Sequence, residues 1–258
     1  MTNQEFIIKC GHWFSNLFDD TNIKVGTDTT ISEPVSMSYF GAAPTIMIPS
    51  AYVARSEEIP NLYEIDTGKL FLLLIACHEL AHLLYYHHDQ NTINTSTRMS
   101  ATELWADFYG AIIFFYLAYL NQELITEILL SEHQSEENLL ATYGCAVESL
   151  LSILDSAQNS ENYPVAVERI QAMIVGPLSF FGRVNRYTSE EKKIWAMSKI
   201  YGNTGLMKFF LESDLDPNNM DLLQSCRESH LALKKNEYSI LPKMRPEVRG
   251  LILPDFVQ

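Results

Sequence analysis

One of the two strongly apolar stretches of this chain is interrupted by three polar side chains. Residues 70–84 are otherwise hydrophobic, but His78, Glu79 and His82 lie near their middle. Two imidazoles and a carboxylate are costly to bury without partners, so a fold that buries this stretch must also satisfy them. We expect a helix over about residues 67–88, in which the two histidines lie on one face, one turn apart.

The spacing of these three side chains is that of an HExxH metal site. Two imidazoles four residues apart on a helix can bind one ion at about 2.0–2.1 Å each. Glu79 then lies near the open coordination position, where it can accept a proton from water and pass it to a leaving amine. The motif therefore predicts one Zn²⁺ ion per chain, with His78 and His82 as ligands and Glu79 as the general base.

A catalytic zinc site needs a third protein ligand, and two residues are candidates. His88 follows His78 by ten residues, but Tyr85 occupies the position where a glycine would let the chain turn back. Glu103 lies at the start of a second expected helix, over about residues 100–120. We therefore predict Glu103 as the third ligand, beside the two histidines.

Asp107 lies one turn after Glu103 on the same helical face. Its carboxylate can accept the free N–H of a ligating histidine, which fixes the tautomer and the ring orientation. A second interpretation remains open, because Ser100 and Glu103 have the spacing of a capping box. In that case Asp107 would simply be exposed.

Two further sequences accompany HExxH. Residues 103–107 read Glu-Leu-Trp-Ala-Asp, and residues 163–170 read Tyr-Pro-Val-Ala-Val-Glu-Arg-Ile. In this combination the chain resembles gluzincin-type metallopeptidases, the family of the CAAX-prenyl proteases and the bacterial heat-shock endopeptidases, whose motifs are HExxH, ExxAD and HPxxxxRI. A tyrosine stands here where the family has histidine. The resemblance implies a zincin-like fold, zinc-dependent cleavage of protein substrates, and catalytic roles for Tyr163 and Arg169 at the substrate carbonyl; weaker candidates for that role are Tyr109, His133 and Tyr143.

Members of that family usually have transmembrane helices, whereas we expect none here. Residues 70–84 carry the three polar side chains, and residues 110–120 are fewer than the roughly 20 that a span needs. Two soluble groups have similar motifs: the Lit-type peptidases, which cut a translation factor during phage exclusion, and the ImmA/IrrE-like peptidases, which cleave repressors. The resemblance therefore implies a role in phage defence or stress regulation.

The net charge and the cysteines indicate which kinds of partner the protein has and in which cellular compartment it lies. The chain has 18 Lys and Arg against 32 Asp and Glu, a net charge of −14, which disfavours nucleic acids and anionic membrane surfaces. Its four cysteines form no CxxC pair, and the N-terminus has no basic segment before an apolar one. We therefore expect a cytoplasmic protein with reduced thiols.

The expected partners are a protein or peptide substrate and a second protein that activates or inhibits the site. A different class of function stays open: a metal-binding regulator or sensor that acts by binding a partner instead of by proteolysis. A chain that had lost activity would be free to lose Glu79, and its presence favours the enzyme.

The rest of the sequence predicts an α+β fold, mostly helical, with a small N-terminal antiparallel sheet. Short β-prone segments lie between about residues 23 and 55, and within them residues 43–53 are expected to form an edge strand that pairs with an extended substrate. We expect a zincin-like core over residues 1–174 and a helical C-terminal extension over 175–258, packed on the same domain. The further helices are expected at about 135–156, 164–174, 189–201, 204–213 and 219–235, before an irregular tail over 237–258.

Overall fold

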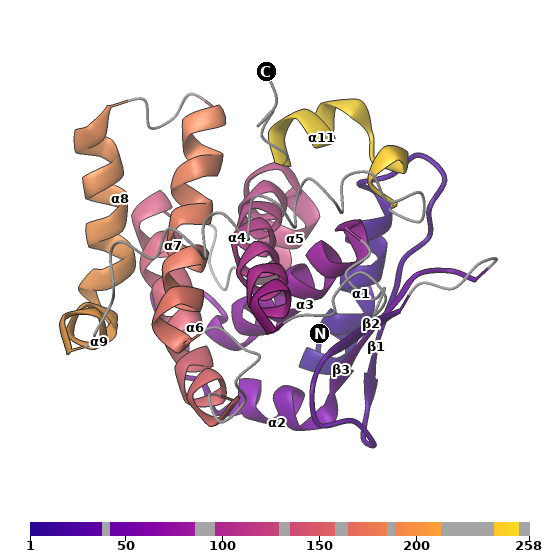
Figure 1. Ribbon diagram of the computed structural model, residues 1–258, viewed down its shortest axis with the longest axis horizontal. Coiled ribbons are helices and arrows are strands. Elements are labelled where there is room, and N and C mark those ends of the chain that lie inside the picture. Colours follow the sequence, from indigo (N-terminus) through magenta and orange to yellow (C-terminus); the bar gives the residue numbers. More distant parts are fainter. Residues whose placement is uncertain are drawn as a thin grey trace.

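The fold is taken from a computed structural model that describes residues 1–37, 42–85, 96–128, 135–157, 165–184, 189–212 and 240–252. It is α+β: a predominantly helical body lies beside a small three-stranded sheet (Figure 1). The strands are β1 (Lys24–Asp28), β2 (Val35–Met37) and β3 (Thr45–Pro49). The helices are α1 (Asn3–Ser15), α2 (Ser50–Glu58), α3 (Thr67–Tyr85), α4 (Ser96–Leu120), α5 (Gln122–Ile128), α6 (Glu136–Ala157), α7 (Ala166–Arg183), α8 (Glu190–Gly202), α9 (Leu206–Glu212) and α11 (Pro246–Ile252), with a 3₁₀ turn η1 (Leu241–Lys243).

The sheet is mixed, so the expectation of an antiparallel sheet is wrong for one of its two pairings. The strand order is β1-β3-β2; β3 runs parallel to β1 and antiparallel to β2. The alternation of buried and exposed residues within a strand does not encode its partner or direction, and the long-range packing of the sheet decides both.

The prediction that residues 43–53 form an edge strand is also wrong. β3 is the central strand, hydrogen-bonded on both sides, and the chain turns into α2 at Ser50. β2 is an edge strand of the sheet, and it packs against α3.

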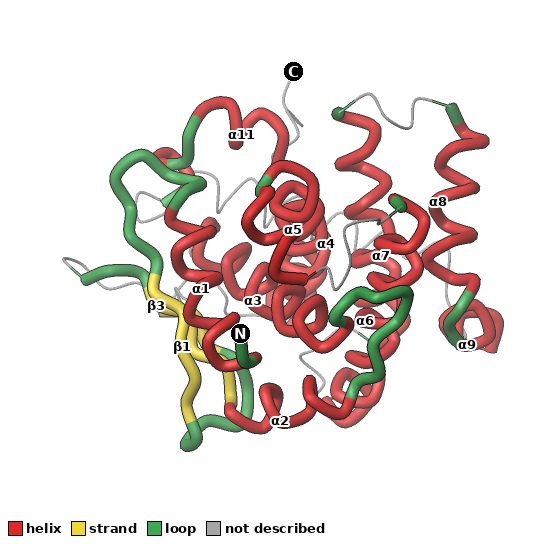
Figure 2. The backbone as a smooth tube through the Cα atoms, turned by 180° about the vertical axis from the view of Figure 1, so that it is seen from behind, coloured by secondary structure: helices red, strands yellow, loops and turns green. Residues whose placement is uncertain are grey.

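Helix α3 is the centre of the molecule. It packs against α1, α2, α4, α6 and the sheet (Figures 1 and 2), which explains why it is apolar on all sides. Leu70, Phe71, Leu72 and Leu73 are all fully buried, and each such side chain contributes about 1.5–3 kcal/mol. At its start, the Asp66 carboxylate accepts a hydrogen bond from the backbone N–H of Lys69 at 3.0 Å and so caps the helix.

Among the described residues, one helix is long and apolar enough to cross a membrane. It is α3, where 94% of the window Thr67–Leu84 is buried inside the structure. A second candidate arises only if Ala101–Tyr119 and Gln122–Ile128, which are bent by 94°, are counted as one broken span. A fully packed core helix passes the same test, and burial among the surrounding elements accounts for the composition of α3.

The C-terminal part packs along the same helical body. Helix α7 runs through residue 174 without a break and lies along α4, while α8 packs on α6 and α7. The expected helices near 189–201 and 204–213 correspond to α8 and α9. The tail expected to be irregular contains η1 and α11, which begins at Pro246, a position that suits proline because the first helical N–H has no partner. The expected helix at 219–235 lies outside the described residues.

Candidate metal centre

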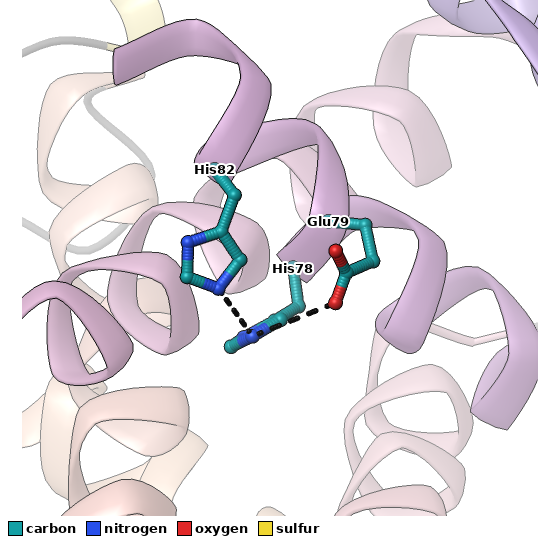
Figure 3. A group of neighbouring side chains, drawn as sticks. All are labelled: His78, Glu79 and His82. Atoms are coloured by element: carbon teal, nitrogen blue, oxygen red, sulfur yellow. Dashed lines mark hydrogen bonds and ion pairs between the residues drawn. The ribbon is translucent and has the colours of Figure 1, made fainter. Parts of the chain in front are cut away.

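Helix α3 brings the three polar side chains of the HExxH motif together (Figure 3). The Nε2 atoms of His78 and His82 lie 2.9 Å apart, and the nearer oxygen of Glu79 is 3.9 Å from His78 Nε2. One donor atom from each of the three residues lies within 4.8 Å of the others. This group could hold a metal ion, as its spacing predicts.

Glu103 reaches the same point from the neighbouring helix α4. One of its carboxylate oxygens is 3.5 Å from His78 Nε2 and the other is 3.5 Å from His82 Nε2. Around a tetrahedral ion with bonds of about 2.0–2.1 Å, neighbouring donor atoms are about 3.3–3.4 Å apart. The two separations to Glu103, one through each of its oxygens, lie close to that value, whereas the two Nε2 atoms lie closer together than a tetrahedral ion would place them. Glu103 approaches both imidazoles more closely than Glu79 approaches His78, which favours Glu103 over Glu79 as the third donor.

Asp107 lies behind His78, one helical turn after Glu103. Its Oδ1 atom is 2.8 Å from His78 Nδ1, and its side chain is fully buried. A carboxylate at this position favours the tautomer with the proton on Nδ1, which leaves the lone pair of Nε2 directed at His82 and Glu103.

Arg169, from helix α7, joins the two acidic side chains of α4. Its Nε and Nη2 atoms donate to the two Asp107 oxygens at 2.7 and 3.0 Å, and Nη2 lies 3.3 Å from Glu103 Oε2. The guanidinium is largely buried. Arg169 therefore connects helix α7 to both acidic side chains of the candidate site.

The surroundings shift the pKa values of the site residues in different directions. Burial raises the pKa of Glu79 above its usual value, although His78, Ser36 and Arg169 oppose the rise. Burial also acts to raise the pKa of Glu103, but the nearby His82, His78 and Arg169 outweigh it and lower that pKa well below its usual value. Two carboxylates with opposite shifts suit a proton carrier and a permanently ionised ligand, respectively.

The pKa of His78 is also strongly shifted. Burial disfavours its charged form, but Asp107 and Glu103 outweigh burial and raise the pKa to about 10. Without a metal, His78 is therefore protonated at neutral pH. A metal ion that binds its Nε2 must displace that proton.

Two residues near the site were not found from the sequence. Ser36 in β2 is buried and hydrogen-bonds the Glu79 carboxylate. Tyr52 in α2 is partly buried, and burial is the main reason that its pKa is raised; smaller electrostatic contributions come from Glu79 and Arg169, among others. Neither residue belongs to a motif, and only the folding of β2 and α2 against α3 brings them here.

The structure describes two of the other residues that were predicted to contact the substrate. Tyr143 is fully buried and its hydroxyl donates to the Met173 carbonyl at 2.7 Å. Tyr109 is also fully buried, with its ring stacked on Trp105, so neither tyrosine is exposed to solvent in this structure. Predictions made for three residues, Tyr163, His88 and His133, lie outside the described residues.

Comparison with known proteins adds no relative. No protein-family model matches the chain, and neither a curated protein nor a solved structure does.

Proposed function

We propose that this protein is a zinc-dependent endopeptidase that hydrolyses a peptide bond in a protein substrate. One observation carries the proposal: donor atoms of His78, His82 and Glu103, from two helices, converge with separations of 2.9–3.5 Å. Glu79 stands beside them. A His₂Glu donor set with an adjacent second glutamate is the ligand arrangement of catalytic zinc sites.

His78, His82 and Glu103 would hold the ion. When bound, zinc lowers the pKa of a coordinated water to about 7 and polarises a carbonyl oxygen. Two neutral imidazoles and one carboxylate leave the centre a net positive charge, which stabilises negative charge that develops on the substrate oxygen.

Glu79 is the proposed proton carrier. Its raised pKa brings it nearer to neutral pH, where one group can accept a proton from water and return it to the leaving nitrogen. Ser36 hydrogen-bonds this carboxylate and so restricts its orientation. Asp107 and Arg169 keep His78 and Glu103 in the orientation that binding requires.

The substrate would bind along β2. β2 is an edge strand packed on α3, and Ser36 in its middle contacts the general base. A substrate that lies beside this strand would therefore lie close to Glu79.

A metal count combined with a cleavage search tests the function. Wild-type protein and the His78→Ala and Glu103→Ala variants are purified without added metal, and bound metals are counted by elemental mass spectrometry. We expect one zinc per wild-type chain and loss or weakening in both variants. A proteome-wide search for new peptide ends then compares the wild type with Glu79→Gln, which should bind zinc but not cleave.

Three results would contradict parts of this proposal. A wild type that takes up no zinc removes the metal centre altogether. Zinc retained by Glu103→Ala but lost from His78→Ala assigns the third ligand to another residue. Zinc binding with no cleavage that depends on Glu79 favours the metal-binding regulator, whose role in phage defence or stress response would then rest on partner binding.

A further inference from the structure

The two helices that carry the proposed ligands are in close backbone contact at a glycine. A Cβ atom on Gly110 of α4 would lie 2.9 Å from both the Cα and the N of His78, and 3.2 Å from the carbonyl carbon of Cys77. Contacts below 3.0 Å are essentially never found for a real Cβ. The atoms in the way belong to backbone, so no side-chain rotation could relieve the contact, and α4 would have to move away from α3.

A second glycine, Gly176, lies at a similarly close contact between α7 and α4. A Cβ on Gly176 would lie 2.7 Å from the carbonyl oxygen of Phe108 and 2.7 Å from the Cβ of Ala111. Phe108 directly follows Asp107. Helix α7 therefore touches the backbone of α4 at the turn that carries one of the acidic site residues.

Each glycine lies on the same face of its helix as the site residues which that helix carries. Glu103, Asp107 and Gly110 have the spacing i, i+4, i+7, and Arg169 and Gly176 have the spacing i, i+7. Residues at these spacings line one side of a helix. The separation of the helix axes at each glycine thus sets how far the Glu103, Asp107 and Arg169 side chains must reach.

We infer that Gly110 and Gly176 are positioning residues of the metal centre, an inference that rests on the proposed zinc site. Their missing side chains set the separations of α3, α4 and α7 at which Glu103 contacts both imidazoles. Metal–ligand distances tolerate only about 0.2 Å of change. To turn a 2.9 Å contact into an ordinary one of at least 3.4 Å, α4 must move away from the ligating histidine by more than that tolerance.

Three glycine-to-alanine variants test this inference. Gly110→Ala and Gly176→Ala change the two crossings at the site. Gly144→Ala is the control, because its Cβ would clash with the backbone carbonyl of Ile200 where α6 packs on α8, and neither of those helices carries a proposed ligand. All three should lower the free energy of unfolding.

The decisive measurement is zinc affinity per folded molecule. It is measured by competition with a chelator, with the folded fraction determined by circular dichroism. We expect Gly110→Ala to bind zinc about 10–100-fold more weakly than the wild type, the loss typical when a group that orients a ligand is disturbed. Gly176→Ala should show a smaller loss, and Gly144→Ala none. The visible spectrum of bound Co²⁺, which depends on ligand geometry, should change in the first two variants and stay the same in the control.

If a variant is unfolded in buffer, the same measurement is made at low temperature in sucrose, because excluded osmolytes favour the compact state. If Gly110→Ala stays unfolded there, Gly176→Ala decides. Zinc affinity and Co²⁺ spectra like those of the wild type in a folded site variant would overturn the inference, as would equal losses in all three variants. A wild type that binds no zinc would instead refute the proposed function itself, so the two failures are distinguishable.

Discussion

Arg169 and Asp107, which lie 62 residues apart in sequence, form a buried bidentate ion pair. Nε and Nη2 of the arginine donate to separate oxygens of the aspartate at 2.7 and 3.0 Å. The same aspartate lies 2.8 Å from His78 Nδ1. One carboxylate therefore connects α7, a helix far along the chain, to the first histidine of the candidate metal site.

Replacing Arg169 should lower both stability and zinc affinity. Arg169→Met leaves the Asp107 carboxylate buried beside fewer positive groups, and breaking a buried pair from one side costs about 3–5 kcal/mol. Arg169→Lys keeps the charge but loses the bidentate geometry, so an intermediate loss is expected. Urea unfolding of the metal-free protein measures the first effect and chelator competition the second. An Arg169→Met variant as stable as the wild type would show that the ion pair contributes nothing.

Asp107→Asn should weaken zinc binding and, because Arg169 loses its charged partner on this residue, also lower the free energy of unfolding. Asparagine has nearly the same shape, but its neutral amide is a poorer partner for His78 Nδ1, so the imidazole is a weaker ligand. The expected loss is about 10–100-fold in zinc affinity. Asp66→Asn on α3 is the control, because asparagine caps a helix as well as aspartate does, and its affinity should match the wild type. Equal affinities for all three proteins would remove Asp107 from the site.

Glu79→Gln should separate binding from catalysis. Glutamine cannot accept the proton, so the rate of substrate cleavage should fall by about 10²–10⁴-fold, while bound zinc stays at the wild-type level. The rate is measured with a substrate found in the cleavage search. A large loss of zinc in this variant would instead assign Glu79 as a ligand.

Ser36→Ala should change the pH dependence of cleavage. Glu79 must be ionised to act as a base, so kcat/KM falls as the pH drops through its pKa. The hydrogen bond from Ser36 lowers that pKa against the rise caused by burial, and its loss should move the acidic limb of the profile to higher pH. Ser198→Ala, which changes an exposed serine on α8 that donates a hydrogen bond to the Trp195 carbonyl, should leave the profile unchanged. An acidic limb that moves to lower pH would contradict the role given to Ser36.

The stability of the metal-free protein and its affinity for zinc should respond to pH in opposite directions. The pKa of His78 is raised from 6.5 to about 10. Its charged form therefore stabilises the folded state fully below pH 6.5, and this contribution is lost as the pH rises toward about 10. Zinc must displace the same proton, so its affinity should increase over that range. Urea unfolding and chelator competition at several pH values check both trends, and His78→Gln should show neither contribution.

The sequence alone determined which segments form the two helices of the candidate site and which side chains share a face of each helix. The all-round apolar pattern of residues 70–84 requires a buried helix, and the i, i+4 spacing puts His78 and His82 on one face of it. The same spacing puts Glu103 and Asp107 together on the next helix. These features follow from neighbours along the chain, because helical geometry fixes which side chains share a face.

The tertiary structure decided how these local pieces meet. It placed β3 in the middle of the sheet and β2 at an edge beside Glu79, and it directed Arg169 to the carboxylates of α4. It also brought α4 against the backbone of His78 at Gly110. Strand order and helix separation depend on packing between segments far apart in sequence, and no local pattern of residues records either of them.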